Sequence, residues 1–241
     1  MLQEQKIIHI PEFGEIPITK KKGCRRLNIR VNAREVKVSI PFRSSFIEGE
    51  RFLLEKLSWI KETSQKLSER LPKKVIYDEH SILFTQVGII KIEKNKSEKY
   101  TFKKDGFETT IFIPVSAEIL AETTQISIKH HITSYIRKEA KYYFPIRVNF
   151  LAQKINVRYG KVKINNATSR WGSCSYRNDI NLNLKLLFLP EELSDYVIFH
   201  ELAHVLHKNH GPQFWEFLEK IAGEAKQKAK KLKKFNISEM P

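Results

Sequence analysis

Residues 200–210 read HELAHVLHKNH, and this short stretch holds four of the eight histidines in a chain of 241 residues. Upstream of it, Pro190 and two glutamates are typical of a helix start. Apolar residues then recur at helical spacing as far as Val205. The sequence therefore predicts that the His-Glu-x-x-His pattern lies on an amphipathic helix.

Two of these histidines are placed to share one metal ion. On a helix, His200 and His204 lie one turn apart on the same face, so both imidazoles can reach an ion at about 2.0–2.1 Å. Glu201 lies beside the pair and is not needed as a ligand. It can instead act as a general base that takes a proton from a water molecule made acidic by the ion. The alternative is that these are ordinary polar histidines facing solvent. In that case the presence of the glutamate and of a third histidine beside them is a coincidence.

The third ligand must come from a histidine that follows the motif. If the helix continued straight, His207 would lie about 10 Å along the axis from the first histidine, too far for both to bind one ion. His210 would be farther still, so it can bind only if the chain turns back. Asn209 tolerates the left-handed conformation that ends helices, and a Gly-Pro pair that can start a new helix follows soon after. We expect His210 to be the ligand, with His207 supporting the site or facing solvent.

The same spacing carries a family resemblance. The chain has His-Glu-Leu-x-His, five residues, His, three residues and Phe-Trp, and so resembles the YgjP-like group of zinc metallopeptidases, related to the SprT-like and WLM peptidases. Residues 170–175 (RWGSCS) and 56–60 (KLSWI) are also similar to that group, so the resemblance covers most of the chain. The spacing also coincides with the metzincin pattern, but His207 stands where that pattern has a glycine. No Met-turn is identifiable either, so we do not place the chain among the metzincins.

The resemblance implies a zincin-type catalytic domain with one Zn²⁺ per chain. It implies that Glu201 is catalytic and that the zinc ligands are His200, His204 and His210. It implies little about the physiological substrate.

The first half of the chain reads as β-rich with one helix. Alternating apolar and polar residues predict a hairpin over 27–40, with its turn at 32–34. Helical spacing predicts a helix over 46–71, ended by Pro72. Short strands are expected at 82–92, 100–102 and 109–113.

The second half reads as helix, small sheet, helix, helix. A helix is expected over 126–144, stopped before Pro145. Strands are expected at 162–164 and 180–189, followed by the motif helix and a last helix over 212–235. The predicted fold class is α+β, with a β-rich N-terminal module at 1–125 and a zincin-like metallopeptidase domain with the HExxH helix at 126–241.

The composition argues against a membrane span or a disulfide framework. Hydrophobic residues make up 41% of the chain, enough for a buried core. Residues 1–14 lack the apolar stretch of a signal peptide, and no apolar run approaches the roughly 20 residues that span a bilayer. The two cysteines, Cys24 and Cys174, are too few for a disulfide framework. We expect a cytoplasmic protein that is not bound to a membrane.

The charge is strongly positive and uneven. Net charge is +16, and residues 1–125 carry 23 Lys and Arg against 17 Asp and Glu, whereas 126–241 carry 20 against 10. Such a surplus attracts polyanions, so nucleic acid is a physically reasonable partner. The lysines of 220–234 could form a phosphate-binding stripe, or equally a solvated helix end.

The predicted reaction is hydrolysis of peptide or protein substrates. The alternatives are a nucleic-acid-associated protein, a protease acting on DNA-bound proteins, or hydrolysis of a non-peptide amide. The sequence assigns no substrate-binding residue. Trp171, with the arginine before it, could line the cleft, although packing beneath the motif helix is more typical of such a segment. Cys174 could cap the zinc as an inhibitory thiolate, although a small buried thiol is the commoner role. The candidates to stabilise an oxyanion are Tyr142, Tyr143 and Tyr176.

Overall fold

The computed structural model describes residues 4–32, 35–69 and 75–241. The chain divides into two compact units, 1–72 and 73–241, so the division lies well before the boundary expected near residue 125. Part of the expected hairpin turn at 32–34 and the expected helix end at Pro72 lie outside the described residues.

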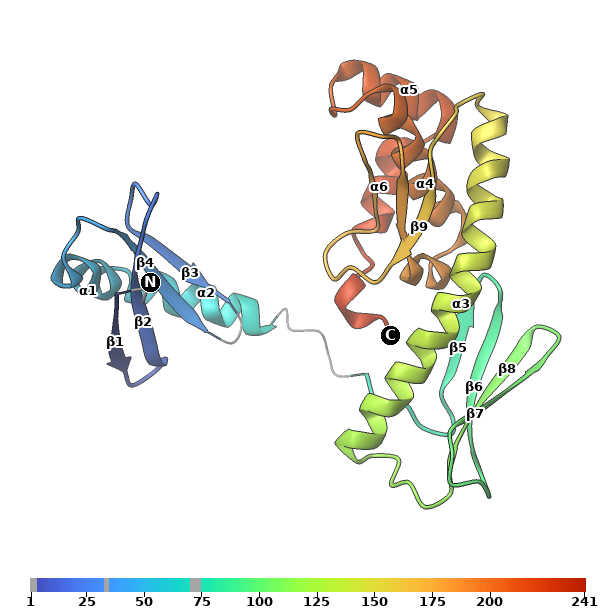
Figure 1. The fold of residues 1–241 in the computed structure, drawn as a ribbon, viewed down its shortest axis with the longest axis horizontal. Helices are drawn as coiled ribbons and strands as arrows, with labels where there is room; N and C mark the ends of the chain where they lie inside the picture. The colour runs from blue at the N-terminus through green and yellow to red at the C-terminus, as the bar shows by residue number, and fades with distance from the viewer. Residues whose placement is uncertain (1–3, 33–34, 70–74) are drawn as a thin grey trace. The chain divides into compact units, whose positions relative to one another are not determined.

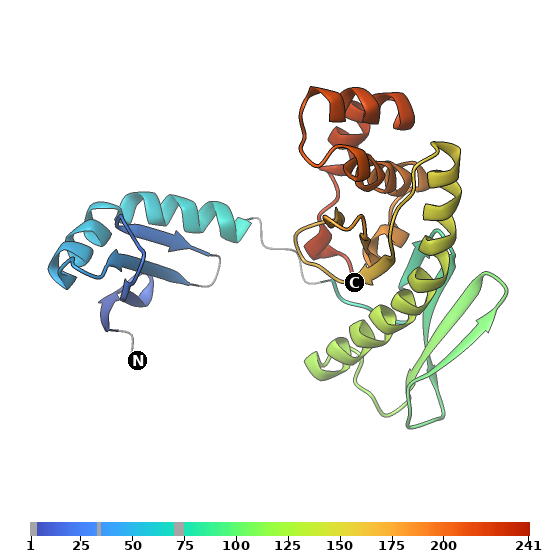
Figure 2. The same cartoon turned by 45° about the horizontal axis from the view of Figure 1, so that its top comes forward.

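The first unit is a four-stranded sheet with two helices (Figures 1 and 2). Its strand order is β1-β2-β4-β3, with β3 and β4 antiparallel and β2 and β4 parallel. The predicted hairpin over 27–40 is thereby confirmed. The strands are β1 (Gln5–Ile10), β2 (Gly14–Lys21), β3 (Asn28–Val31) and β4 (Val36–Pro41).

The single helix expected over 46–71 is two helices. They are α1 (Phe46–Glu55) and α2 (Leu57–Glu69). Lys56 separates them with φ −103° and ψ 8°, and its N–H donates to the carbonyl of Leu53, a tightened last turn. Leu53 and Ile60 are both fully buried in the unit's apolar cluster. Because they are seven residues apart, the apolar spacing looks unbroken and cannot reveal the interruption.

The second unit begins with another four-stranded sheet, of order β5-β6-β8-β7. Its strands are β5 (Ile82–Thr85), β6 (Gly88–Asn95), β7 (Thr101–Asp105) and β8 (Glu108–Pro114). Ile92 and Ile111 on this sheet share one buried cluster with Ile132 and Ile136 on the following helix. This shared core explains why a boundary near residue 125 is wrong: it would cut the sheet away from the helix that covers it.

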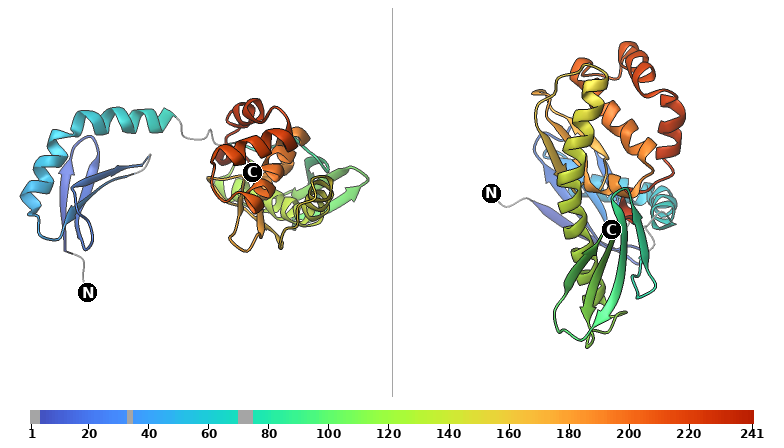
Figure 3. Two further views of the ribbon diagram at one scale, coloured as in Figure 1. Left: turned by 90° about the horizontal axis from the view of Figure 1, so that it is seen from above. Right: turned by 90° about the vertical axis from the view of Figure 1, so that its right-hand side faces the viewer.

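The longest element, α3 (Glu122–Lys154), continues through Pro145 instead of stopping before it. Ten of its residues are buried between Thr124 and Ala152, which stabilises the helix on both sides of the proline. Pro145 removes the N–H that would bond the carbonyl of Lys141. Lys141 is exposed, so the missing hydrogen bond lies on the solvent side of the helix and not in the core. Figure 3 shows α3 running from the β5–β8 sheet to the C-terminal helices.

A small second sheet and the C-terminal helices complete the unit. The strand expected over 180–189 ends at Asn183, and the chain continues as a 3₁₀ helix. The single helix expected over 212–235 is broken at Gly223 and Glu224, which have φ of 60° and 50°. The sheet has the order β10-β11-β9. The elements are β9 (Val162–Asn165), β10 (Gly172–Cys174), β11 (Ile180–Asn183), η1 (Leu184–Phe188), α4 (Glu191–Leu206), α5 (Pro212–Ala222), α6 (Ala225–Leu232) and η2 (Ile237–Glu239).

The mixed α+β class is therefore confirmed. Within the described ranges, no helix combines the length and the apolar character needed to cross a bilayer. The 33 residues of α3 are long enough, but their mean hydropathy is too low.

Candidate metal centre

The His-Glu-x-x-His pattern lies on α4, as the sequence predicts. The rings of His200 and His204 are 4.9 Å apart between centroids. After Leu206 the helix ends, and the chain returns so that Nε2 of His210 lies 3.0 Å from Nε2 of His200. One nitrogen from each of the three rings lies within 4.8 Å of the other two. The expected reversal of the chain is present.

The reversal begins at His207 and not at a left-handed Asn209. His207 caps α4 in an extended conformation, with φ −125° and ψ 96°. In the described part of the chain, positive φ outside glycine occurs at Asn156, Asn178 and Glu224 only. The His207 carbonyl lies 3.0 Å from Nδ1 of His204. In the tautomer with the proton on Nδ1, this hydrogen bond leaves Nε2 of His204 with a free lone pair, an arrangement typical of metal-binding histidines.

Two of the histidine nitrogens lie at the spacing of neighbouring ligands around a tetrahedral metal ion. Bonds of about 2.0–2.1 Å in tetrahedral geometry place two ligands roughly 3.3 Å apart, close to the 3.0 Å between Nε2 of His200 and Nε2 of His210. Burial, followed by the charges of His204 and His210, lowers the pKa of His200 to about 4. Burial also lowers the pKa of His204. Both rings are therefore neutral near pH 7, the form that binds a metal.

Phe214 supports the three imidazoles from α5. Its ring is fully buried and lies with centroids 4.6 Å from His204, 4.6 Å from His210 and 5.0 Å from His200. The neighbouring Trp215 lies 5.8 Å from His210. The Phe-Trp pair therefore packs against the histidines that precede it in the motif.

Glu201 is buried next to the cluster. It is 5% exposed, and its Oε2 has no hydrogen-bond partner among the described residues. Burial raises the pKa of Glu201 to about 8, opposed by the charge of Arg170. A Cβ added to Gly172 of β10 would lie 2.7 Å from Oε1 of Glu201. Only glycine at this position lets the strand approach the carboxylate so closely.

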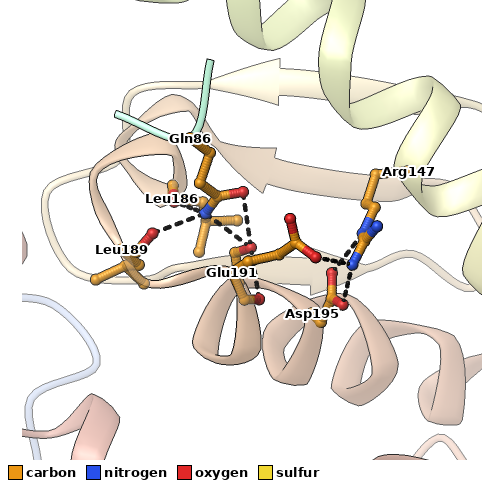
Figure 4. Close-up of polar contacts among 7 residues, drawn as sticks. Gln86, Arg147, Leu186, Leu189, Glu191 and Asp195 are labelled. Atoms are coloured by element: carbon orange, nitrogen blue, oxygen red, sulfur yellow. Dashed lines mark hydrogen bonds and ion pairs between the residues drawn. The ribbon is translucent and has the colours of Figure 1, made fainter. Parts of the chain in front are cut away.

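Two polar networks hold the start of α4 (Figure 4). Nε2 of Gln86 lies 2.9, 2.8 and 2.9 Å from the Leu186 carbonyl, the Leu189 carbonyl and the Ser194 hydroxyl. Arg147 of α3 pairs with Asp195, its Nε donating over 2.8 Å, and with Glu191. No sequence pattern signals these contacts, because their partners lie 44 to 108 residues apart.

Of the other sequence candidates, Trp171 lies at the site. It lines a cavity beside His200 and Glu201. Cys174 is half-buried, with Sγ 3.9 Å from the Lys208 ammonium, and burial raises the pKa of its thiol. The tyrosine in the cavity wall is Tyr196, which the sequence analysis missed. It precedes His200 by four residues, one helical turn, and that spacing could have identified it.

The proposed oxyanion tyrosines lie outside this cavity's lining. Tyr142 and Tyr176 are 76% and 93% exposed, and the lining does not include Tyr143. In the lysine stripe, Lys228 donates to the Ala222 carbonyl and Lys231 pairs with Glu192. Nucleic-acid binding stays a prediction.

Comparison with known proteins identifies the family. The family model described as "YgjP-like, metallopeptidase domain" matches residues 25–235. The metallopeptidase zymogen jannalysin of Methanocaldococcus jannaschii is 26% identical, with a TM-score of 0.33 over 36% of this chain and 90% of that one. The zymogen abylysin of Pyrococcus abyssi is 25% identical, with a TM-score of 0.34 over 36% of this chain and 89% of that one.

These two structural similarities are too low in TM-score to carry an argument. No curated protein matches the chain. The family match spans most of the sequence and confirms the resemblance carried by the histidine motif and the RWGSCS segment. The chain belongs to the YgjP-like family of metallopeptidases and is a metal-dependent peptidase.

Proposed function

We propose that this protein is a zinc-dependent peptidase in which His200, His204 and His210 hold the metal and Glu201 is the general base. The observation that carries the proposal is the convergence of three imidazole nitrogens within 4.8 Å beside a buried carboxylate whose Oε2 has no hydrogen-bond partner in the part of the chain that the structure describes. All four residues lie within the second unit, 73–241, for which we propose a zincin-like catalytic fold.

The donor set supports zinc. Imidazole nitrogens suit borderline ions such as Zn²⁺, whereas Mg²⁺ and Ca²⁺ prefer oxygen ligands. Three protein ligands leave a fourth position open, as a catalytic site requires and a structural site does not. Zinc in this position would polarise the substrate carbonyl and increase the acidity of water.

Glu201 performs the proton transfers. The Oε2 of Glu201 would accept a proton as water adds to the carbonyl carbon. This role requires the ionised carboxylate, and the positive charge of a metal held by the three histidines would favour that form over the neutral acid that burial favours. The C–N bond then breaks, and Glu201 gives the proton to the departing amine. The histidine rings keep their orientation, because Phe214 packs against all three and the His207 carbonyl holds His204.

The edge strand beside Glu201 supports a peptide substrate over other amides. β10 lies at the end of the sheet order β10-β11-β9, and its Gly172 faces the Glu201 carboxylate. An extended peptide paired with this edge would carry its backbone past the general base.

The test is Glu201→Gln in the full chain, measured for zinc content and for cleavage of an unfolded protein. The variant should keep about one zinc ion per chain and lose cleavage by at least about 10²-fold, the low end for general-base catalysis. Glu216→Gln, at an exposed glutamate of α5, is the matched control and should keep both. A Glu201→Gln protein that cleaves as fast as its parent refutes the general-base role.

A further inference from the structure

An apolar cavity of about 320 Å³ opens beside the proposed catalytic residues, within the second unit. His200 and Glu201 form part of its lining. The rest of the wall is mainly apolar and comes from three parts of the chain: Trp171 before β10, Tyr196 and Val197 on α4, and Leu232 at the end of α6 with Phe235 shortly after it. We call it the side-chain pocket.

The C-terminal wall of the side-chain pocket is anchored. Lys185 is 6% exposed, and its ammonium donates to the carbonyls of Ile237 and Met240 over 2.9 and 3.1 Å. Lys231 of α6 pairs with Glu192 of α4 over 3.1 Å. These contacts lie on both sides of Leu232 and Phe235, so the wall is fixed before a ligand enters.

From this geometry we infer that the side-chain pocket binds a bulky apolar side chain, such as leucine, methionine or phenylalanine, of a residue that flanks the scissile bond. The inference rests on the proposed function, because the pocket shares His200 and Glu201 with the proposed metal centre. It names a substrate class and assigns Leu232 and Phe235 as residues that set the specificity.

The size of the side-chain pocket supports this substrate class. A cavity of about 150 Å³ lined by apolar side chains is enough to bind benzene. The side-chain pocket has about 320 Å³, so a phenylalanine ring or a branched aliphatic side chain fits without a change in the wall. Burying such a side chain, compared with none, improves binding by about tenfold or more.

The charges in the lining disfavour a basic side chain. Glu201 is the only acid among the residues that line the side-chain pocket, and its carboxylate is proposed to handle the reaction's proton. Lys233 adds a positive charge to the wall. A lysine or arginine side chain would therefore lose water without gaining an ion-pair partner.

The first arm of the test measures binding without turnover. Saturation-transfer NMR is recorded on the full-length Glu201→Gln protein with the N-acetyl, N-methylamide derivatives of leucine, phenylalanine, glycine and lysine. The leucine and phenylalanine probes should bind at least tenfold more tightly than the other two. Leu232→Trp should remove that advantage by filling the pocket, whereas Lys230→Trp, the same change at an exposed position of α6, should keep it. If Leu232→Trp fails to fold, Ala229→Leu fills the same wall with a smaller group.

The second arm measures cleavage of a peptide library by the zinc-loaded protein with Glu201 intact, read by mass spectrometry. Leucine, methionine and phenylalanine should be enriched about tenfold at one position next to the cut, and Leu232→Trp should shift that position to glycine, alanine or serine. Apolar binding that depends on Leu232 without any cleavage keeps the side-chain pocket and refutes the proposed function. Cleavage without enrichment, together with binding that Leu232→Trp leaves unchanged, overturns the side-chain pocket and keeps the proposed function.

Discussion

At the level of single residues, the two histidines that follow the motif have different roles. The ring of His210 reaches the cluster, whereas His207 contributes its backbone carbonyl and directs its ring at Phe217, 5.7 Å away. His210→Ala should therefore remove most of the bound zinc, while His207→Ala should retain it, because alanine keeps the carbonyl. Zinc analysis after gel filtration checks both, and the opposite ranking would show that the assigned third ligand is wrong.

Gly172 provides a second test at this scale. An alanine Cβ would lie 2.7 Å from Oε1 and 2.8 Å from Cγ of Glu201, so the buried carboxylate would have to move. A small displacement of a catalytic group costs about 10- to 100-fold in rate. We expect Gly172→Ala to lose cleavage in this range and to keep its zinc, since no metal ligand is touched.

The matched control for Gly172→Ala is Gly211→Ala. A Cβ at Gly211 meets nothing within 4 Å, and the residue has φ −74°, which alanine adopts freely. This variant should cleave at the parent rate. Equal activity of the two alanine variants would contradict the close approach of β10 to Glu201.

The eleven-residue motif could be interpreted from sequence because its chemistry is local. Helical spacing alone places His200 and His204 on one face. A turn of the chain after the motif is enough to bring His210 back to them, and the residues that allow this turn lie within the same stretch. Tyr196, Leu232 and Phe235 were not assigned to the site, because their meeting in one cavity depends on how α4 and α6 pack. Tertiary packing of this kind leaves no mark on local periodicity.

On the scale of elements, Gln86 anchors the start of α4. Leucine at this position would leave two carbonyls and the Ser194 hydroxyl without their amide partner. Each lost buried hydrogen bond costs about 1–3 kcal/mol, so Gln86→Leu should lower the free energy of unfolding by at least about 1 kcal/mol. Urea denaturation measures this change. Gln153→Leu, at an exposed position of α3, is the control, and an equal loss in both variants would refute the anchoring role.

Element boundaries show where local rules fail. The pre-proline rule predicts that α3 stops before Pro145, but burial on both sides of the proline outweighs one missing hydrogen bond on the solvent side of the helix. The strand expected through residue 189 stops at Asn183, whose side chain accepts a hydrogen bond from the Lys185 N–H and caps η1. The apolar run that follows is a buried 3₁₀ helix, which periodicity cannot distinguish from a strand over so few residues.

For the molecule as a whole, the structure changes where the chain divides into two units. The β5–β8 sheet belongs to the unit that contains the three clustered histidines, since its core residues and those of α3 form one cluster. The change from expected strands to expected helices near residue 125 suggested a boundary, whereas long-range packing places it at 72. The family match at 25–235 includes most of both units.

The most direct test of the metal centre is anomalous diffraction at the zinc edge from crystals of the full chain grown with zinc. We expect one strong peak per chain, within about 2.0–2.1 Å of a nitrogen from each of His200, His204 and His210, with the Glu201 carboxylate outside the ligand set. For His204 the nitrogen should be Nε2, because Nδ1 contacts the His207 carbonyl. A peak coordinated by the His207 ring or by Glu201, or one away from α4, would refute the proposed three-histidine site.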